Sequence, residues 1–154
     1  MDDLVVRPAQ HGDIDELTEL MYAYIVDFYQ RPKPPVEKLH ALIGMLLFKQ
    51  QGIQFVAWQN GKLVGFATLY FTFSTLRPDK IAVMNDLYVA EEVRGTGVAA
   101  SLFEACHTYA TENGYAHMSW VTADDNRRAQ RFYAKMGGQA ADWINYSIPT
   151  TNKH

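Results

Sequence analysis

The stretch EEVRGTGVAASL, residues 91–102, places two glycines between an arginine and an apolar run with helical spacing. A glycine-rich turn that leads into a helix can bind a phosphate group, because backbone N–H groups converge there and the helix dipole favours an anion. The same letters would also fit an ordinary turn between a strand and a helix. The residues around this stretch therefore have to decide what it does.

The composition is that of a globular protein without a nucleic-acid or membrane role. The chain has 154 residues, of which 48% are hydrophobic, and this predicts a single domain over residues 1–154. The formal net charge is −3, so no excess of positive charge is available for a phosphate backbone. The N-terminus shows no secretory signal, and no apolar run reaches the roughly 20 residues that span a bilayer. We therefore expect a cytoplasmic protein.

Cysteine and histidine usage predicts neither a disulfide nor a metal site. Cys106 is the only cysteine, which excludes an intrachain disulfide and favours a packing role. The five histidines are scattered and form no H-x-x-x-H pair. No metal is expected.

The apolar pattern predicts an α/β domain with a mixed sheet. Asn60-Gly61 lies between two β-type runs and is a strong hairpin signal. Asp13 and Glu16 have capping-box spacing at the start of the first expected helix. The predicted order is a strand at 5–8, helices at 13–30 and 36–50, the hairpin, a strand at 81–89, a helix at 98–113, a strand at 117–123, a helix at 126–136 and a strand at 140–148.

Two common nucleotide-binding patterns do not account for the glycine turn. A Walker A loop ends in Gly-Lys-Ser/Thr, whereas Gly97 is followed by valine. Gly95, Gly97 and Ala100 match the dinucleotide pattern G-x-G-x-x-G/A, but only about 55 residues follow, too few for the remaining βαβ units. The ribose-binding acid of that pattern is expected near Tyr115, and the nearest acid is Glu112, inside a helix.

Beginning at Arg94, the same stretch fits R/Q-x-x-G-x-G/A and resembles the pyrophosphate loop of the GNAT superfamily of acyl-CoA N-acyltransferases. Residues 119–138, SWVTADDNRRAQRFYAKMGG, resemble the second block of that family, N-x-x-A-x-x-F-Y-x-x-x-G. NDLYV (85–89) resembles its central splayed strand, and LVVRPAQHGDIDELTEL (4–20) is a typical opening. The resemblance implies the GNAT fold, a mixed central β-sheet with splayed central strands flanked by helices. The positions that match the second block are Asn126, Ala129, Phe132, Tyr133 and Gly137.

The resemblance also implies acetyl-CoA as co-substrate. The backbone of Leu87, Tyr88 and Val89 would pair with the pantetheine arm like an added strand. Asn126 and Ala129 would hold the cofactor from the helix of the second block. The pyrophosphate would be bound by the loop residues Arg94, Gly95, Thr96, Gly97, Val98, Ala99 and Ala100.

The resemblance further implies that Tyr133 is the general acid toward the coenzyme A sulfur and that it also contacts the cofactor. A phenol is a weak acid at neutral pH, but it can protonate a forming thiolate. Tyr133 lies with Ala129, Phe132 and Met136 in a set with helical spacing, so on spacing alone it would fit a core tyrosine. Asn126 follows two aspartates and could be a helix cap, a cofactor ligand or both.

The acceptor side is expected at Asn85 and Asp86, two polar residues inside an otherwise apolar strand. The carboxylate of Asp86 could attract a cationic amine and help to remove its proton, directly or through water. Within the superfamily the pattern most resembles the diamine (spermidine/spermine) N-acetyltransferase branch, which usually has Glu-Asp here. In the first helix, Tyr24 and Asp27 could hold an alkylammonium group, although both could equally be ordinary helix-face residues.

The sequence therefore predicts an enzyme that acetylates a primary amine of a small molecule, polyamine-like or amino-acid-like, by direct attack in a ternary complex. Two alternatives stay open at this point. One is a non-catalytic acyl-CoA-binding module on the same fold, and the other is acetylation of a protein or peptide amine. A homodimer is expected from the resemblance alone.

Overall fold

The glycine turn follows the fourth strand of a five-stranded sheet in the computed structural model, which describes residues 3–150. The chain divides into two units, Met1–Val121 and Thr122–His154, and the sheet belongs to the first. Its strands follow in chain order, antiparallel except for the parallel pair β4–β5. This confirms the predicted mixed α/β class. The strands are β1 Val5–Pro8, β2 Gly52–Gln59, β3 Lys62–Ser74, β4 Asp79–Val89 and β5 Met118–Ser119.

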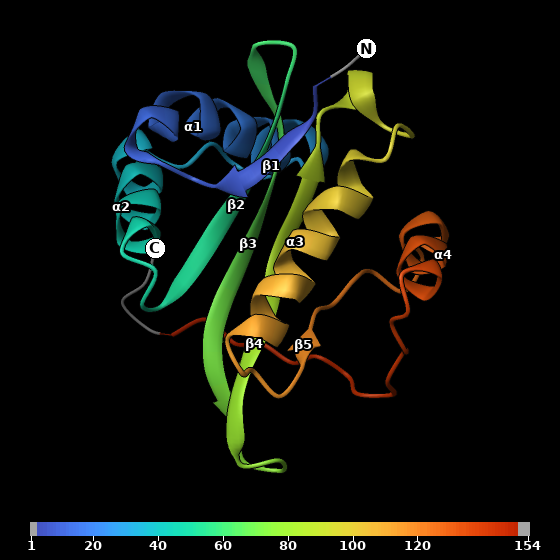
Figure 1. The fold of residues 1–154 in the computed structure, drawn as a ribbon. Helices are drawn as coiled ribbons and strands as arrows, with labels where there is room; N and C mark the ends of the chain where they lie inside the picture. Colours follow the sequence, from blue (N-terminus) through green and yellow to red (C-terminus); the bar gives the residue numbers. More distant parts are fainter. Residues whose placement is uncertain (1–2, 151–154) are drawn as a thin grey trace. The chain divides into compact units, whose positions relative to one another are not determined.

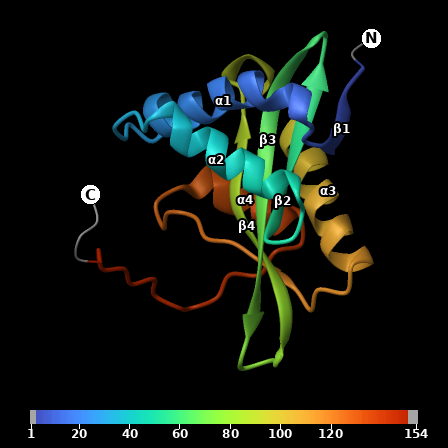
Figure 2. The same cartoon turned by 90° about the vertical axis from the view of Figure 1, so that its left-hand side faces the viewer.

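Helices cover both faces of this sheet, as Figures 1 and 2 show. Helices α1 (Ile14–Tyr22) and α2 (Val36–Leu47) pack on one face, and α3 (Val98–Glu112) packs on the other. The alternation of side chains along each strand explains the two apolar layers. The buried core beneath α1 and α2 includes Leu17, Met21, Leu39, Ile43, Val56 and Phe66, and the buried side chains of α3 are Val98, Leu102, Phe103, Cys106 and Ala110.

The hairpin predicted at Asn60-Gly61 is confirmed. Both residues have positive φ, 54° and 81°, as a type I′ turn requires, and Gln59 pairs with Lys62. Strands β3 and β4 then continue past the end of β2, which pairs with β3 only as far as Tyr70. They form a hairpin that extends beyond the rest of the sheet (Figure 1).

The predicted helix over 13–30 is interrupted in its second half. A short 3₁₀ turn, η1 (His11–Asp13), precedes α1, and the π-helical segment η2 (Ala23–Phe28) follows it. The N–H of Tyr29 donates to the carbonyl of Tyr24, five residues earlier. Apolar spacing does not distinguish this wider turn from an α-helix, because both place every third to fifth residue on the same side.

The predicted capping box of Asp13 and Glu16 is wrong. The carboxylate of Asp13 accepts from Arg7 and from the N–H of Gln10, so it caps the preceding turn. Glu16 instead accepts from the N–H of Leu63 in β3, 2.9 Å away. Both side chains therefore form hydrogen bonds with other partners instead of the capping box that their spacing predicts.

The second unit contains one helix, α4 (Arg127–Lys135), among its described residues. The side chain of Asn126 accepts from the N–H of Ala129 at 3.1 Å and so caps α4. The helix ends in a Schellman motif, with Gly137 at φ 99° and the N–H of Gly138 donating to the carbonyl of Tyr133.

The last predicted strand, 140–148, is wrong. Residues 139–150 form neither helix nor strand, and all of them are exposed. Its apolar alternation is typical of a strand, but a strand also needs a partner, and no described strand pairs with it. The strand predicted at 117–123 shrinks to β5, while α2, α3 and α4 end one to three residues earlier than predicted.

Candidate active site

The loop between β4 and α3 presents an uncapped helix N-terminus. Gly97 is the N-cap residue of α3, with φ 95° and ψ 0°, and no side chain caps the helix. The first N–H groups of an α-helix have no intrahelical partner, so those of Val98, Ala99 and Ala100 are donors for an outside group. No acidic residue lies in the first turn. The helix therefore offers an anion both donors and the positive end of its dipole.

Two glycines give this loop its shape. Gly95 and Gly97 have φ of 81° and 95°, a region that residues with a Cβ rarely adopt. No neighbouring atom lies within 4 Å of where a Cβ would stand on either one. The glycines are thus required by backbone conformation, and the space beside them is open. Thr96, between them, donates its hydroxyl to the carbonyl of Val93.

Arg94 is fixed by three contacts beside this loop. Its Nε donates to the carbonyl oxygen of Val89 at 2.9 Å. Its guanidinium carbon lies 5.7 Å from the centre of the Phe28 ring and 5.6 Å from that of Tyr88. No carboxylate among residues 3–150 is within ion-pair distance of Arg94. Its charge is therefore available to an anion.

The last residues of β4 leave one backbone edge open. Leu87, Tyr88 and Val89 pair with β3 on one side. On the other side β5 pairs only with Ala82 and Val83, so the described strands diverge beyond that point. An open strand edge can accept an extended ligand as an added strand.

Asn85 and Asp86 lie at a β-bulge. Thr68 pairs with Asp86 and Leu69 with Met84, so Asn85 has no opposite residue on β3. Asn85 is exposed and donates its side-chain amide to Asp86 at 3.2 Å. Bulges redirect side chains and are frequent beside active sites. Here the bulge explains how two polar residues can stand in an otherwise apolar strand.

Asp86 interacts with two tyrosines. Burial raises the pKa of the Tyr24 phenol strongly, and the charge of Asp86 and a side-chain hydrogen bond to it raise it further. Burial and the charge of Asp86 also raise the pKa of Tyr70 in β3. Both phenols therefore stay protonated at neutral pH and can donate a hydrogen bond. The structure thus brings together Tyr24, Asn85 and Asp86, whereas Asp27 is exposed and forms no ion pair with a described residue.

In the second unit, the residues of the predicted second block share one face of α4. Asn126, Ala129 and Tyr133 are half-buried and are spaced by three and four residues, whereas Arg127 and Arg131 are exposed. The ring of Tyr133 meets that of Phe132 edge-on at 5.4 Å.

Residues 14–138 match the Acetyltransferase (GNAT) family. The chain belongs to this family. It is 30% identical over 132 residues to an uncharacterized N-acetyltransferase, YhfO, of Bacillus subtilis (strain 168), an alignment that covers 86% of this chain and 87% of that protein. It is also 36% identical over 78 residues to the D-amino-acid N-acetyltransferase HPA3 of Saccharomyces cerevisiae, covering 51% and 48% of the two chains.

The fold of this GNAT protein is shared with solved acetyltransferases. The aminoglycoside N-acetyltransferase AAC(6')-Iy, solved in complex with CoA, superposes with a TM-score of 0.84 over 97% of this chain and 96% of that one, at 16% identity. The predicted GNAT fold is thereby confirmed. Membership of the family also makes the protein an acyl-CoA-dependent N-acetyltransferase.

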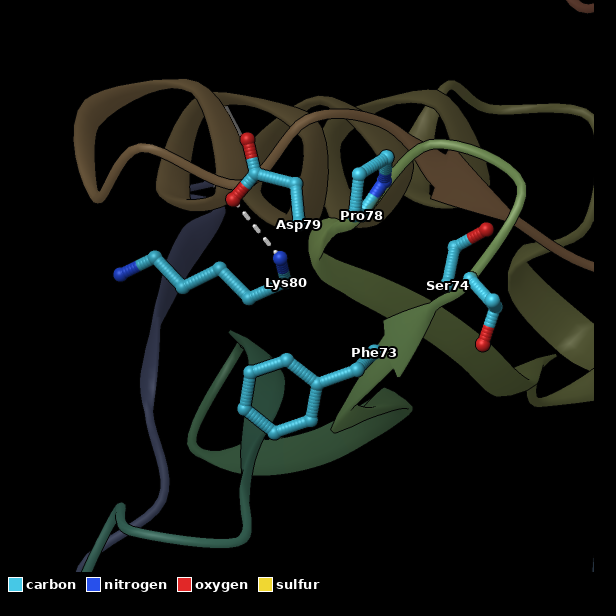
Figure 3. A pocket seen from close by; sticks show the side chains of 6 residues that line it. Phe73, Ser74, Pro78, Asp79 and Lys80 are labelled. Carbon is cyan, nitrogen blue, oxygen red and sulfur yellow. Dashed lines mark hydrogen bonds between the residues drawn. The ribbon is translucent and has the colours of Figure 1, made fainter.

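The described part of the chain holds no group of three or more potential metal ligands, and none of its helices is long and apolar enough to cross a membrane. A hollow of about 460 Å³ lies at the tip of the β3–β4 hairpin (Figure 3). Phe73, Pro78, Asp79 and Lys80 are among the residues that line it, and the Lys80 N–H donates to Asp79. None of its lining residues comes from the glycine loop or the bulge.

Cys106 has no catalytic role in this arrangement. It lies on the buried face of α3, and burial raises the pKa of its thiol to about 12, so the reactive thiolate does not form at neutral pH. The predicted packing role of Cys106 agrees with this position.

Sequence reasoning did not single out Tyr70 or Phe28 as individual site residues. Tyr70 lies in a hydrophobic strand, where tyrosine is a common residue and does not by itself indicate a site. Only the pairing of β3 with β4 brings it near Asp86. Phe28 lies among other aromatic residues in the stretch MYAYIVDFY (21–29), and its contact with Arg94 depends on a loop 66 residues away in the chain.

Proposed function

We propose that this protein transfers the acetyl group of acetyl-CoA to a primary amine of a small molecule, by direct attack in a ternary complex. The observation that carries the proposal is the uncapped N-terminus of α3 preceded by Arg94, next to the open edge of β4. An anion-binding turn beside an open strand edge suits a ligand with a pyrophosphate and an extended, amide-containing arm, and coenzyme A is such a ligand.

In this proposal the cofactor is bound mainly by backbone groups. The edge at Leu87, Tyr88 and Val89 pairs with the pantetheine arm. The amides from Gly95 through Ala100 hold the pyrophosphate, and Arg94 adds a charge-assisted contact. Asn126 and Ala129 contribute from α4, a role that rests on the family motif.

The chemistry requires a neutral amine and a proton for the departing thiolate. We assign the first task to Asp86, which would hold a cationic amine and accept its proton, directly or through water. Tyr133 is assigned the second task, since a phenol positioned at the sulfur can protonate it as the carbon–sulfur bond breaks. The neutral amine nitrogen attacks the thioester carbonyl, and the carbon–sulfur bond breaks as Tyr133 gives its proton to the sulfur. The nitrogen loses its second proton to solvent, which returns a proton to the Tyr133 oxygen, so the products are the amide and coenzyme A as the thiol.

For the acceptor we propose an amino-acid-like or polyamine-like amine. The relative HPA3 bears the name of a D-amino-acid N-acetyltransferase, which supports the first class. The pattern around Asn85 and Asp86 resembles the diamine branch, which supports the second. In both cases Tyr24, Asp27 and the bulge residues would receive the ammonium group, through ionic and cation–π contacts.

Calorimetry with acetyl-CoA and a turnover assay over a panel of amines would test this function. The panel holds polyamines, D- and L-amino acids, aminoglycosides and peptides with a free amine. We expect acetyl-CoA binding and release of free thiol with a polyamine or an amino acid. The function is excluded if purified protein fails to bind acetyl-CoA, and turnover only with peptides would transfer it to the peptide class.

Tyr133→Phe tests the proposed acid. Turnover should fall by about a hundredfold or more, while the affinity for acetyl-CoA changes little, because general acid catalysis contributes about 10²–10⁴ to a rate. Tyr146→Phe is the matched control, since Tyr146 is 88% exposed outside every helix and strand. Equal turnover in wild type and Tyr133→Phe would remove the acid role.

A further inference from the structure

The side chain of Arg94 is held where the proposed function needs it by a residue from a different part of the chain. Arg94 precedes the glycine turn and is exposed, so without contacts a long flexible side chain there would sample many rotamers. Its Nε is anchored on the carbonyl of Val89, at the open end of β4. This single hydrogen bond fixes the Nε atom, but the rest of the guanidinium group can still turn about that atom.

Two aromatic rings supply the remaining restraint. The guanidinium carbon lies within 6 Å of both ring centres, 5.7 Å for Phe28 and 5.6 Å for Tyr88, which is the range of a cation–π contact. The two rings lie 6.2 Å apart and are steeply inclined, at 61°. Arg94 thus rests against two non-parallel rings that come from two separate elements.

Phe28 is the last residue of the π-helical segment η2 and lies in a cluster of aromatic rings. Within η2, Tyr24 and Phe28 both contact the ring of Tyr88, at 5.5 and 6.2 Å. Tyr29 packs edge-on against both of them, at 5.1 and 5.0 Å. Phe28 is 49% exposed, so it adds little to the core and its ring is left for Arg94. Isolated π-helical turns often occur at functional sites.

The surrounding charges do not provide another partner for Arg94. Glu92 is the nearest acidic neighbour in sequence, and its carboxylate pairs with Lys62 at 3.3 Å. The charge of Arg94 still acts on Glu92 and contributes to lowering the pKa of Glu92, after larger effects from hydrogen bonds. An anionic ligand that binds beside the loop would therefore contact an oriented guanidinium group that forms no ion pair with a described carboxylate.

We propose that Phe28 is a positioning residue for coenzyme A, which orients Arg94 toward the pyrophosphate and so links the first helical segment to the cofactor loop. The inference rests on the proposed function. Phe28 itself touches neither the thioester nor, in this proposal, the phosphates. Preorganisation raises affinity because less side-chain freedom is lost on binding.

The test is the affinity for coenzyme A, measured by calorimetry on the full chain with Phe28→Leu, Phe28→Tyr and Arg94→Gln. Phe28→Leu should raise the dissociation constant about two- to fivefold, the size of one exposed cation–π contact. Phe28→Tyr keeps the ring and should bind like wild type. In the Arg94→Gln background, Phe28→Leu should have no further effect, because the ring acts through the guanidinium.

A second readout separates positioning from general damage to the fold. In turnover assays Phe28→Leu should raise the KM for acetyl-CoA and leave kcat nearly unchanged, since it removes binding that is equal in the ground and transition states. Phe48→Leu is the control, because Phe48 is also an exposed ring, at 79%, and is not part of this cluster. Phe28→Met replaces Phe28→Leu if the leucine variant does not fold.

The possible results are distinct. If wild type binds no coenzyme A, the proposed function fails, and this inference fails with it. If wild type binds but Phe28→Leu binds equally well or more tightly, Phe28 does not position Arg94 and only this inference is overturned. The same holds if Phe28→Leu weakens binding to the same extent in the Arg94→Gln background. Weaker binding that disappears in that background supports the inference.

Discussion

At the scale of single residues, Asp13 shows how one carboxylate fixes the start of the first helical segment. Its oxygens accept from Arg7 at 2.7 and 3.0 Å and from the N–H of Gln10 at 2.8 Å, and its side chain is only 10% exposed. The hydrogen bond from Arg7, with that from Gln10, lowers the pKa of Asp13 although burial opposes the shift. The pair therefore ties β1 to the turn that precedes α1.

We expect Asp13→Asn to lower the free energy of unfolding by about 1–3 kcal/mol at pH 7, because the half-buried Arg7 loses its charged partner. The pKa of Asp13 in the folded state lies below its unfolded-state pKa of about 3.9, so the ion pair contributes its full stabilisation at every pH above about 3.9. It is then lost as the pH falls through the folded-state pKa. Urea unfolding at pH 7 and pH 3 should show the gap between wild type and variant shrinking at low pH.

Glu92→Gln is the control for this effect at the same scale. Lys62 and Glu92 form the other ion pair of the described residues, but their side chains are 56% and 59% exposed. Exposed pairs contribute little, because water and salt screen them. Equal losses for the two variants, or a loss for Asp13→Asn that does not depend on pH, would contradict the assignment.

At the scale of elements, the close approach of α3 to the sheet depends on Gly65 in β3. A Cβ on this residue would lie 2.8 Å from the carbonyl oxygen of Tyr88 and 3.1 Å from a methyl carbon of Leu102. Gly65→Ala should therefore lower the free energy of unfolding by about 1–3 kcal/mol, as overpacking does. Gly44→Ala, inside α2, should raise it by about 0.5–1 kcal/mol, because no neighbouring atom lies within 4 Å. Urea unfolding measures both changes. If the two variants shift the free energy of unfolding in the same direction, the close packing at Gly65 does not explain its effect.

The elements that sequence predicted best are those fixed by local chemistry. The hairpin at Asn60-Gly61 requires two positive φ angles, and the helix after Gly97 carries its own apolar face, so both could be read from neighbouring residues. The bulge at Asn85 could be suspected only from its polarity, because it depends on how β4 pairs with β3. The prediction of a strand at 140–148 is wrong for a related reason, because an alternating apolar pattern does not show whether another strand is available to pair with it. The contacts of Arg94 with Phe28 and of Asp86 with Tyr70 likewise join distant parts of the chain.

At the scale of the whole molecule, residues 139–150 form a long exposed segment without helix or strand within the part of the chain that the structure describes. All of them are exposed, and Trp143 and Tyr146 expose 80% and 88% of their surface. We expect chymotrypsin, which prefers large apolar side chains, to cut first after one of these two residues, because a protease needs an accessible extended segment. Intact-mass spectrometry over a time course locates the first cut, and the double variant Trp143→Ser/Tyr146→Ser should delay it. A first cut within residues 3–121 would contradict the expectation. Protection that grows with protein concentration would instead mean that a second copy covers this segment, as the homodimer implied by the family resemblance allows.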